Sequence, residues 1–188
     1  MRWMPKSNKL YYTVVAPEGN DVITLDPVTL KEEVLLRGIP EQGFSWSPNE
    51  DFLIYYPREE GVKDEGPLKR IVSPADRIPN TRGRSFLARY DIASGTSERL
   101  TYGNHSTYMQ DISPDGKYLA FTLQEYGGFG VWHKDAELYM IRLSDGKTYP
   151  LSEANSTEGE SYHSWSHNNR WLVFSSRRLD GLYTRPFF

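Results

Sequence analysis

From residue 112 the chain reads Ile112-Ser113-Pro114-Asp115-Gly116-Lys117-Tyr118-Leu119-Ala120-Phe121. An apolar residue ends one strand, a Ser-Pro-Asp-Gly group supplies a turn, and a second apolar strand follows. Proline presets φ at the turn, aspartate bonds to its own backbone, and Gly116 takes positive φ without strain. The segment therefore predicts a β-hairpin.

The same pattern occurs at three other places in the chain. The copies are Trp3-Met4-Pro5-Lys6-Ser7-Asn8-Lys9-Leu10-Tyr11-Tyr12, Trp46-Ser47-Pro48-Asn49-Glu50-Asp51-Phe52-Leu53-Ile54-Tyr55 and Trp165-Ser166-His167-Asn168-Asn169-Arg170-Trp171-Leu172-Val173-Phe174. Their anchors at positions 3, 46, 112 and 165 lie 43, 66 and 53 residues apart, so the unit has 43 residues, with insertions in two copies. A repeat of roughly 40 to 50 residues with strand-like content is typical of β-propeller blades.

A second motif extends each hairpin to a four-stranded unit. A third strand runs into a tight turn within residues 22–29, 87–95 and 139–146, and a fourth strand follows each turn. Such a four-stranded antiparallel meander is one blade, whose strands we letter A to D from the inside outward. We therefore expect an all-β fold, a β-propeller with about four blades present and an incomplete or half ring. The expected blades are blade 1 at about 1–38, blade 2 at about 41–102, blade 3 at about 107–153 and blade 4 at about 161–188, which lacks its outer strand.

Composition argues against several classes of protein. The 188 residues are 38% hydrophobic and 14% aromatic, which fits one globular domain with a substantial core. A formal net charge of -3 disfavours nucleic-acid binding, and the lack of cysteine rules out disulfides and thiolate chemistry. We expect no membrane span and no signal peptide, because no long apolar stretch occurs and residues 1–9 are polar.

Two insertions indicate where a ligand would bind. They cover residues 57–85 and 124–136, and both lengthen the B-to-C connection of their blade. In a meander these connections emerge on one face, and long loops on a rigid scaffold are the usual carriers of binding. Arginine and aromatic side chains dominate interfaces, and the histidines near this face are included with them. The predicted contact residues are Arg77, Arg82, Arg84, His105, Tyr126, Trp132, His133, His163, Arg177 and Arg178.

The sequence shows no catalytic or cofactor signature. None of the four histidines has a ligand-type partner at diagnostic spacing, so we expect no metal site and no cofactor. Gly43-Phe44-Ser45-Trp46-Ser47 lacks the final glycine of a nucleophile elbow, and Ser45 falls inside a strand. The carboxylates that recur at turns, such as Asp26 and Asp91, are expected to cap those turns. We therefore predict no catalytic residue in this chain.

Three stretches resemble the TolB-type propeller repeat, a relative of the tryptophan-aspartate repeats. They are Phe44-Ser45-Trp46-Ser47-Pro48-Asn49, Asp111-Ile112-Ser113-Pro114-Asp115-Gly116-Lys117-Tyr118-Leu119-Ala120-Phe121-Thr122 and Ser164-Trp165-Ser166-His167-Asn168. The resemblance covers essentially the whole chain, and blade 4 looks like TolB-like proteins of Bacteroidetes-type bacteria. It implies a bacterial, often periplasmic or lipid-anchored propeller that binds proteins or cell-envelope material without catalysis. The family usually has six or seven blades, and its motif residues are structural.

Two functional hypotheses remain open at this point. The first is a noncatalytic scaffold that binds a protein or an envelope glycan through the long loops. The second is the substrate-gating propeller of a prolyl oligopeptidase-like hydrolase, or part of a propeller lyase. The blades needed to close the ring would belong to a longer parent chain or to a second copy in a homodimer.

Overall fold

The computed structural model of the chain describes residues 1–39, 43–57, 59, 84–103, 106–125 and 130–188. The side chains of Ser106, Tyr108 and Trp132 also lie outside this description. Within the described part, the strands form four separate antiparallel sheets, accompanied by one short 3-10 helix. The prediction of an all-β fold built from antiparallel blades is confirmed.

The sheets follow one another along the chain, and each is a simple meander. The first contains β1 (Arg2–Trp3), β2 (Leu10–Ala16), β3 (Gly19–Leu25) and β4 (Glu32–Ile39). The second contains β5 (Phe44–Trp46), β6 (Phe52–Tyr55), β7 (Ala88–Asp91) and β8 (Ser97–Arg99). The third contains β9 (Ser106–Ile112), β10 (Tyr118–Gln124), β11 (Glu137–Arg142) and β12 (Lys147–Pro150), with the 3-10 helix η1 (Gly130–Trp132) between β10 and β11. The fourth contains β13 (Glu160–Trp165), β14 (Leu172–Ser176) and β15 (Arg185–Phe187).

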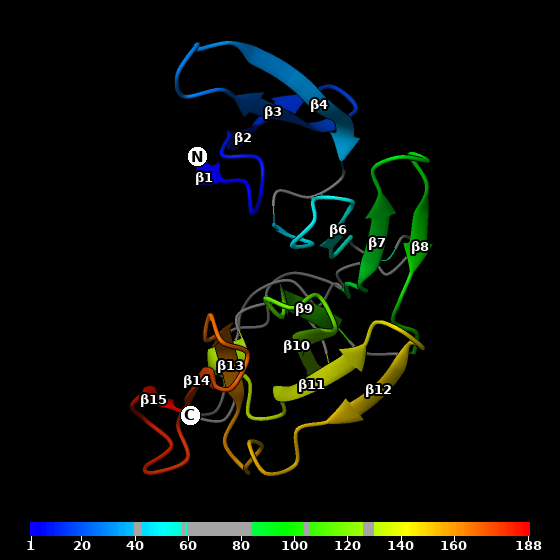
Figure 1. Cartoon of the computed structure of the whole chain (residues 1–188). Coiled ribbons are helices and arrows are strands. Elements are labelled where there is room, and N and C mark those ends of the chain that lie inside the picture. Colours follow the sequence, from blue (N-terminus) through cyan, green and yellow to red (C-terminus); the bar gives the residue numbers. More distant parts are fainter. Residues whose placement is uncertain (40–42, 58, 60–83, 104–105, 126–129) are drawn as a thin grey trace.

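The four sheets are arranged as an arc, like part of a propeller (Figure 1). The inner strands β1, β9 and β13 face the open, concave side, and the outer strands β4, β8 and β12 lie on the outside (Figure 1). The first and fourth sheets form the two ends of the arc, and both ends lie on its open side. The architecture is therefore an incomplete propeller.

A serine that follows the anchor in three of the four hairpin motifs holds the turn. The hydroxyl of Ser47 accepts the backbone N–H of Phe52 at 3.1 Å, and Ser113 and Ser166 accept the equivalent N–H groups of Tyr118 and Trp171 at 2.9 Å. A short polar side chain that bonds the backbone in this way favours a turn over a continued strand. The same local chemistry therefore builds the hairpin in three successive sheets.

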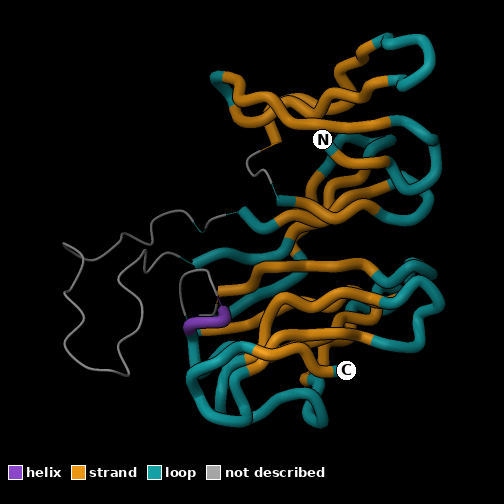
Figure 2. Tube along the Cα trace, turned by 90° about the vertical axis from the view of Figure 1, so that its left-hand side faces the viewer, coloured by secondary structure: helices purple, strands orange, loops and turns teal. Residues whose placement is uncertain are grey.

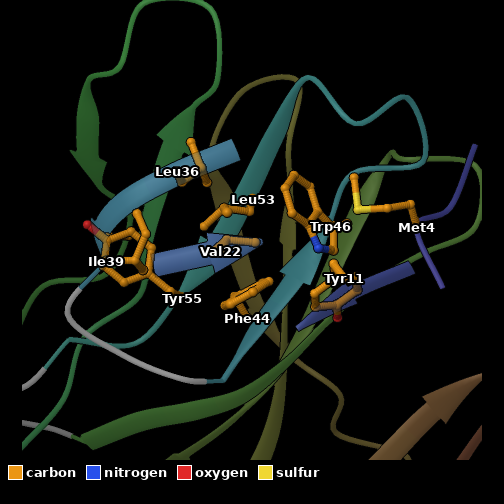
Figure 3. Packing of buried hydrophobic residues seen from close by; sticks show 10 residues of the cluster. Met4, Tyr11, Val22, Leu36, Ile39, Phe44, Trp46, Leu53 and Tyr55 are labelled. Atoms are coloured by element: carbon orange, nitrogen blue, oxygen red, sulfur yellow. The ribbon is translucent and has the colours of Figure 1, made fainter. Parts of the chain in front are cut away.

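The hydrophobic core lies between the sheets. Between the first two sheets, Tyr11, Val22 and Leu36 pack against Leu53 and Tyr55 (Figure 3). Because side chains alternate along a strand, the neighbours Phe52 and Ile54 point to the opposite face of the second sheet. There they pack in a second cluster with Leu119, Phe121 and Ile141 of the third sheet.

Hydrogen bonds between inner strands repeat the same arrangement. The backbone N–H of Ile112 donates to the hydroxyl of Ser45 at 3.2 Å, from the third sheet to the second. The N–H of Trp165 donates to the carboxylate of Asp111 at 3.4 Å, from the fourth sheet to the third. In both cases the donor is the anchor of the motif, and the acceptor precedes the anchor of the neighbouring sheet. The third sheet is thus joined to the second in the same way as the fourth is joined to the third.

One strand lies elsewhere than the sequence pattern predicts. Residues 181–186 read as the third strand of the fourth unit, whereas β15 covers Arg185–Phe187. The carboxylate of Asp180 accepts hydrogen bonds from the backbone N–H groups of Leu182 and Tyr183, both at 2.9 Å. The guanidinium group of Arg185 also donates a hydrogen bond to this carboxylate, at 2.9 Å. This cap holds residues 180–183 in a turn, so the strand begins later.

Candidate functional site

The connections between second and third strands leave the sheets at one end, which we call the loop end. In Figure 2 the helix η1 lies on this side, whereas the tight turns of the hairpin motifs lie on the opposite side. The insertions predicted to bind a ligand thus begin and end on a common face. Arg77, Arg82, His105 and Tyr126 lie outside the described residues.

The first insertion has a closed base. The backbone N–H of Glu59 donates to the carbonyl of Arg84 at 2.8 Å, and the N–H of Phe86 donates to the carbonyl of Pro57 at 3.1 Å. These two bonds continue the antiparallel pairing of β6 with β7 beyond the ends of both strands. Residues 59 and 84 are therefore adjacent, whatever lies between them in sequence.

Arg99 strengthens this base from the neighbouring outer strand. Its guanidinium group forms an ion pair with Glu59 at 3.0 Å and stacks over the ring of Phe86, 4.1 Å from the ring centroid. Both charged side chains are more than half buried, so water screens the pair less than at an open surface. The half-buried Arg84 is the contact candidate that the structure places at this base.

The second insertion is anchored through His133, which is only 4% exposed. Its Nδ1 lies 3.5 Å from a carboxylate oxygen of Asp135. The hydrogen bond from His133 lowers the pKa of Asp135, and the backbone N–H of Glu125 also bonds that carboxylate, at 2.6 Å. His133 is therefore buried where the chain leads from η1 to β11. Trp132 belongs to η1, and its side chain lies outside the described residues.

A buried carboxylate joins the third and fourth sheets at the loop end. Glu160 has no exposed surface and accepts hydrogen bonds from the hydroxyls of Ser156 at 2.6 Å and Ser176 at 2.8 Å. Arg178 lies 3.2 Å from the same carboxylate and also donates to the carbonyl of Ala154. A buried charge needs such partners. Arg178 thus forms part of the framework, and no sequence motif marks Glu160.

Arg177 and His163 lie in different surroundings. Arg177 is half-buried at the end of β14 and donates to the hydroxyl of Thr184 at 3.3 Å. His163 is 9% exposed within the inner strand β13. Burial lowers the pKa of His163 to about 4, against a smaller opposing effect of the Ala120 backbone. His163 is therefore neutral at physiological pH.

Sequence reasoning did not predict a groove between the third and fourth sheets. It has a volume of about 660 Å³ and is lined mainly by apolar side chains, among them Met140, Trp165, Leu172, Phe174 and Phe187. No local motif marks it, because its walls come from strands distant in sequence.

In the described part of the chain, no group of three or more His, Asp or Glu side chains is placed to hold a metal ion. Among the same residues, no helix is long and apolar enough to cross a membrane.

No protein-family model matches the chain, and no curated protein does either. Solved structures with a similar fold include TolB from Acinetobacter baumannii, with a TM-score of 0.62 and 17% identity over 98% of this chain and 39% of that one. A putative TolB from Agrobacterium tumefaciens has a TM-score of 0.64 and 18% identity over 98% of this chain and 58% of that one. An oligogalacturonate lyase in complex with manganese has a TM-score of 0.63 and 17% identity over 98% and 51%.

Likeness at this level of identity concerns the fold, and a propeller fold serves many functions. The chain spans only 39% to 58% of the lengths of these three proteins. Over nearly its whole length, the chain is similar in structure to TolB and TolB-like β-propellers.

Proposed function

We propose that this chain is a noncatalytic propeller scaffold that binds a protein or a cell-envelope ligand through the long connections at its loop end. The observation that carries the proposal is the closed base of the first insertion, where Glu59 bonds the carbonyl of Arg84 at 2.8 Å. A loop presented from a fixed base loses less conformational freedom on binding than one that hangs from a mobile segment.

The proposed contact residues fall into two groups. Side chains on the connections would contact the ligand: Arg77, Arg82, Arg84, His105, Tyr126, Trp132 and Arg177. The other three, His133, His163 and Arg178, would support the connections from below, since the first two are buried and Arg178 is bonded to the buried Glu160. The arginine and aromatic side chains of the first group suit a carboxylate-bearing or sugar-like surface.

Replacing residues 60–83 with Asn-Gly provides a direct test. Residues 59 and 84 already face each other across a hydrogen bond, so a two-residue hairpin turn can join them without disturbing β6 or β7. We expect the shortened chain to keep its circular dichroism spectrum and thermal midpoint but to lose capture of its ligand from a bacterial envelope extract.

A matched control leaves the connections at the loop end at their full length. Val28→Asp alters an exposed turn at the other end of the first sheet and should leave capture unchanged. If the chain without residues 60–83 still captures the same ligand, the assignment to these connections is wrong.

A second candidate function follows from other similar structures. They include the oligogalacturonate lyase and a prolyl endopeptidase, the latter with a TM-score of 0.53 over 94% of this chain and 24% of that one. In this alternative the chain would gate substrate access or form part of a lyase. Incubation with oligogalacturonate, followed by ultraviolet absorbance of the unsaturated product, tests the lyase directly, and product formation would favour it over the scaffold.

An envelope location is proposed because the chain resembles TolB-type proteins. TolB-type proteins are often periplasmic or lipid-anchored, and an envelope ligand would agree with that location. Fractionation of cells that produce the parent protein, followed by immunodetection, would show whether it reaches the envelope.

A further inference from the structure

A flat aromatic surface lies at the loop end, on the connection from β8 to β9. This connection joins the second and third sheets, each of which contacts a sheet on both of its sides. Arg99 ends β8 and pairs with Ala88 at the start of β7, which places Arg99 at the loop end. Three residues further on, Tyr102 is 76% exposed, so most of its ring is accessible to a ligand.

The ring of Tyr102 is held in one position by the residues before it. Its hydroxyl donates to the carbonyl of Arg99 at 3.2 Å, and the guanidinium group of Arg99 lies over the ring, 5.1 Å from the ring centroid. The Nε of Arg99 donates to the carbonyl of Thr101 at 2.6 Å. The hydroxyl of Thr101 accepts the backbone N–H of Leu87 at 2.8 Å, which ties the connection to the second sheet. A ring fixed in advance loses little conformational freedom when a ligand stacks on it.

A carboxylate and a guanidinium group border this ring. The Nη1 of Arg99 lies 3.0 Å from Oε1 of Glu59, and the two side chains are 29% and 27% exposed, so both can be reached from solvent. Within the described part of the chain, Oε2 of Glu59 and Nη2 of Arg99 make no hydrogen bond. The surface therefore offers one flat ring, one acceptor and one donor side by side.

We propose that this surface binds a neutral sugar ring of an envelope glycan. The inference rests on the proposed function and names the class of ligand that the loop end takes. One face of a pyranose ring carries C–H groups, which suit the flat ring of Tyr102. The hydroxyls at its rim both donate and accept, so neighbouring hydroxyls can donate to Glu59 and accept from Arg99.

The balance of charge favours a neutral sugar over an acidic one. Glu59 and Arg99 carry opposite charges and are paired with each other, so the pair has no net charge to offer an anion. The carboxylate of a uronic acid bound on Tyr102 would lie near that of Glu59, and like charges repel. Arg99 is thus a hydrogen-bond donor to the sugar rather than a free cation.

Two-dimensional NMR titrations of the whole chain with defined trisaccharides test this site. The neutral probes are maltotriose, cellotriose and N-acetylchitotriose, and the acidic probe is trigalacturonate. A neutral probe should shift the backbone signals of residues 99–103 and the side-chain Nε signal of Arg99, and trigalacturonate should shift them less. If no neutral probe shifts these signals, or if trigalacturonate binds more tightly, the proposal is wrong.

Substitutions of Tyr102 test the stacking. Tyr102→Ala should raise the dissociation constant of the neutral probe on the order of tenfold, whereas Tyr102→Phe keeps the ring and should change it less. Both variants should fold, because the side chain is exposed. Tyr183→Ala is the matched control, since Tyr183 is 68% exposed on the connection between β14 and β15. An unchanged dissociation constant in Tyr102→Ala would overturn the assignment.

Glu59→Gln tests the role of the ion pair. The variant keeps a side-chain acceptor but leaves the positive charge of Arg99 uncompensated. Its affinity for trigalacturonate should therefore rise relative to its affinity for the neutral probe. The same preference in both proteins would contradict the assignment of a neutral ligand to this pair.

Capture from a bacterial envelope extract separates this site from the proposed function. If Tyr102→Ala keeps capture and binds the neutral probe as well as the original chain does, while the chain without residues 60–83 loses capture, the sugar site is wrong and the scaffold stands. If the chain without residues 60–83 keeps both capture and Tyr102-dependent binding of the probe, the sugar site stands and the assignment to the long connections is wrong. Loss of capture in Tyr102→Ala without binding of any sugar would indicate a protein at this surface and overturn the inference.

Discussion

His163 and Gln110 occupy the same position in successive inner strands, two residues before the anchors Trp165 and Ile112. The amide of Gln110 donates to the carbonyls of Gly43 at 3.1 Å and Ile54 at 3.0 Å in the second sheet. Ala120, whose backbone interacts with His163, holds the motif position of Ile54. His163 thus takes the place of a side chain that links two sheets, and this accounts for its burial.

The variant His163→Gln should reduce the sensitivity of the fold to acid. The pKa of His163 is lowered from 6.5 to about 4 in the folded chain, so between these values the unfolded chain binds a proton that the folded chain does not. Stability is therefore full above pH 6.5 and falls by on the order of 3 kcal/mol as the pH drops to 4.

Glutamine has no such titration and can form the bonds that Gln110 forms. Urea unfolding of both proteins at pH 7.5 and pH 5 measures the difference. The free energies of unfolding should be similar at pH 7.5, and the variant should lose less on acidification. Equal losses at pH 5 would contradict this role for His163.

The connection that carries η1 is held against the start of β13 by a glycine. A Cβ atom at Gly159 would overlap the carbonyl oxygen of His133 and approach that of Gly130 to 3.2 Å. The next residue, Glu160, donates its N–H to the carbonyl of Ala136 at 2.7 Å. The backbone of the second insertion therefore packs directly on the backbone of the fourth sheet, and the connection has a fixed base.

Gly159→Ala should detach this connection. The added methyl group must push the carbonyl of His133 away, at a cost of about 1–3 kcal/mol. Gly146→Ala is the comparison, since a Cβ there meets no atom within 4 Å and the strain comes only from its φ of +70°. Limited proteolysis should cut the chain between β10 and β11 faster in Gly159→Ala and at the original rate in Gly146→Ala. Equal rates in all three proteins would show that this contact does not hold the connection.

The molecule as a whole is stabilised between its sheets. One core cluster joins the first and second sheets, and another joins the second and third. The first three sheets thus depend on their neighbours, as in repeat proteins whose stability is a sum of units and interfaces. Damage at one boundary should therefore weaken the adjoining sheets first.

The variant Phe121→Ala tests whether damage at one boundary weakens the adjoining sheets first, because Phe121 is fully buried between the second and third sheets. Removing its ring should cost about 3–5 kcal/mol. Hydrogen exchange should accelerate in β10 and β11 more than in β2 and β3, which belong to the other cluster. If the alanine variant does not fold, Phe121→Leu can replace it in the same hydrogen-exchange measurement. Uniform acceleration in every sheet would instead indicate a single cooperative core.

Local chemistry made the fold predictable, whereas the supporting residues of the site depend on distant contacts. Serine and proline act within a few residues of their own turns, so each hairpin could be inferred from its own segment. Glu160 becomes important only when Ser156 from the connection before β13, and Ser176 and Arg178 from the end of β14, converge on it. For the same reason, the sequence placed Arg178 in a loop but could not reveal its buried partner.

The bonded pair of Glu59 and Arg84 has a consequence for how such a protein can evolve. Because the two ends of the insertion are held together, its length can change without moving the sheet that carries it. Each doubling of a flexible loop costs only about 0.6 kcal/mol in closure entropy. Related chains could therefore exchange one recognition segment for another at this position, acquiring new ligands while inheriting the same framework.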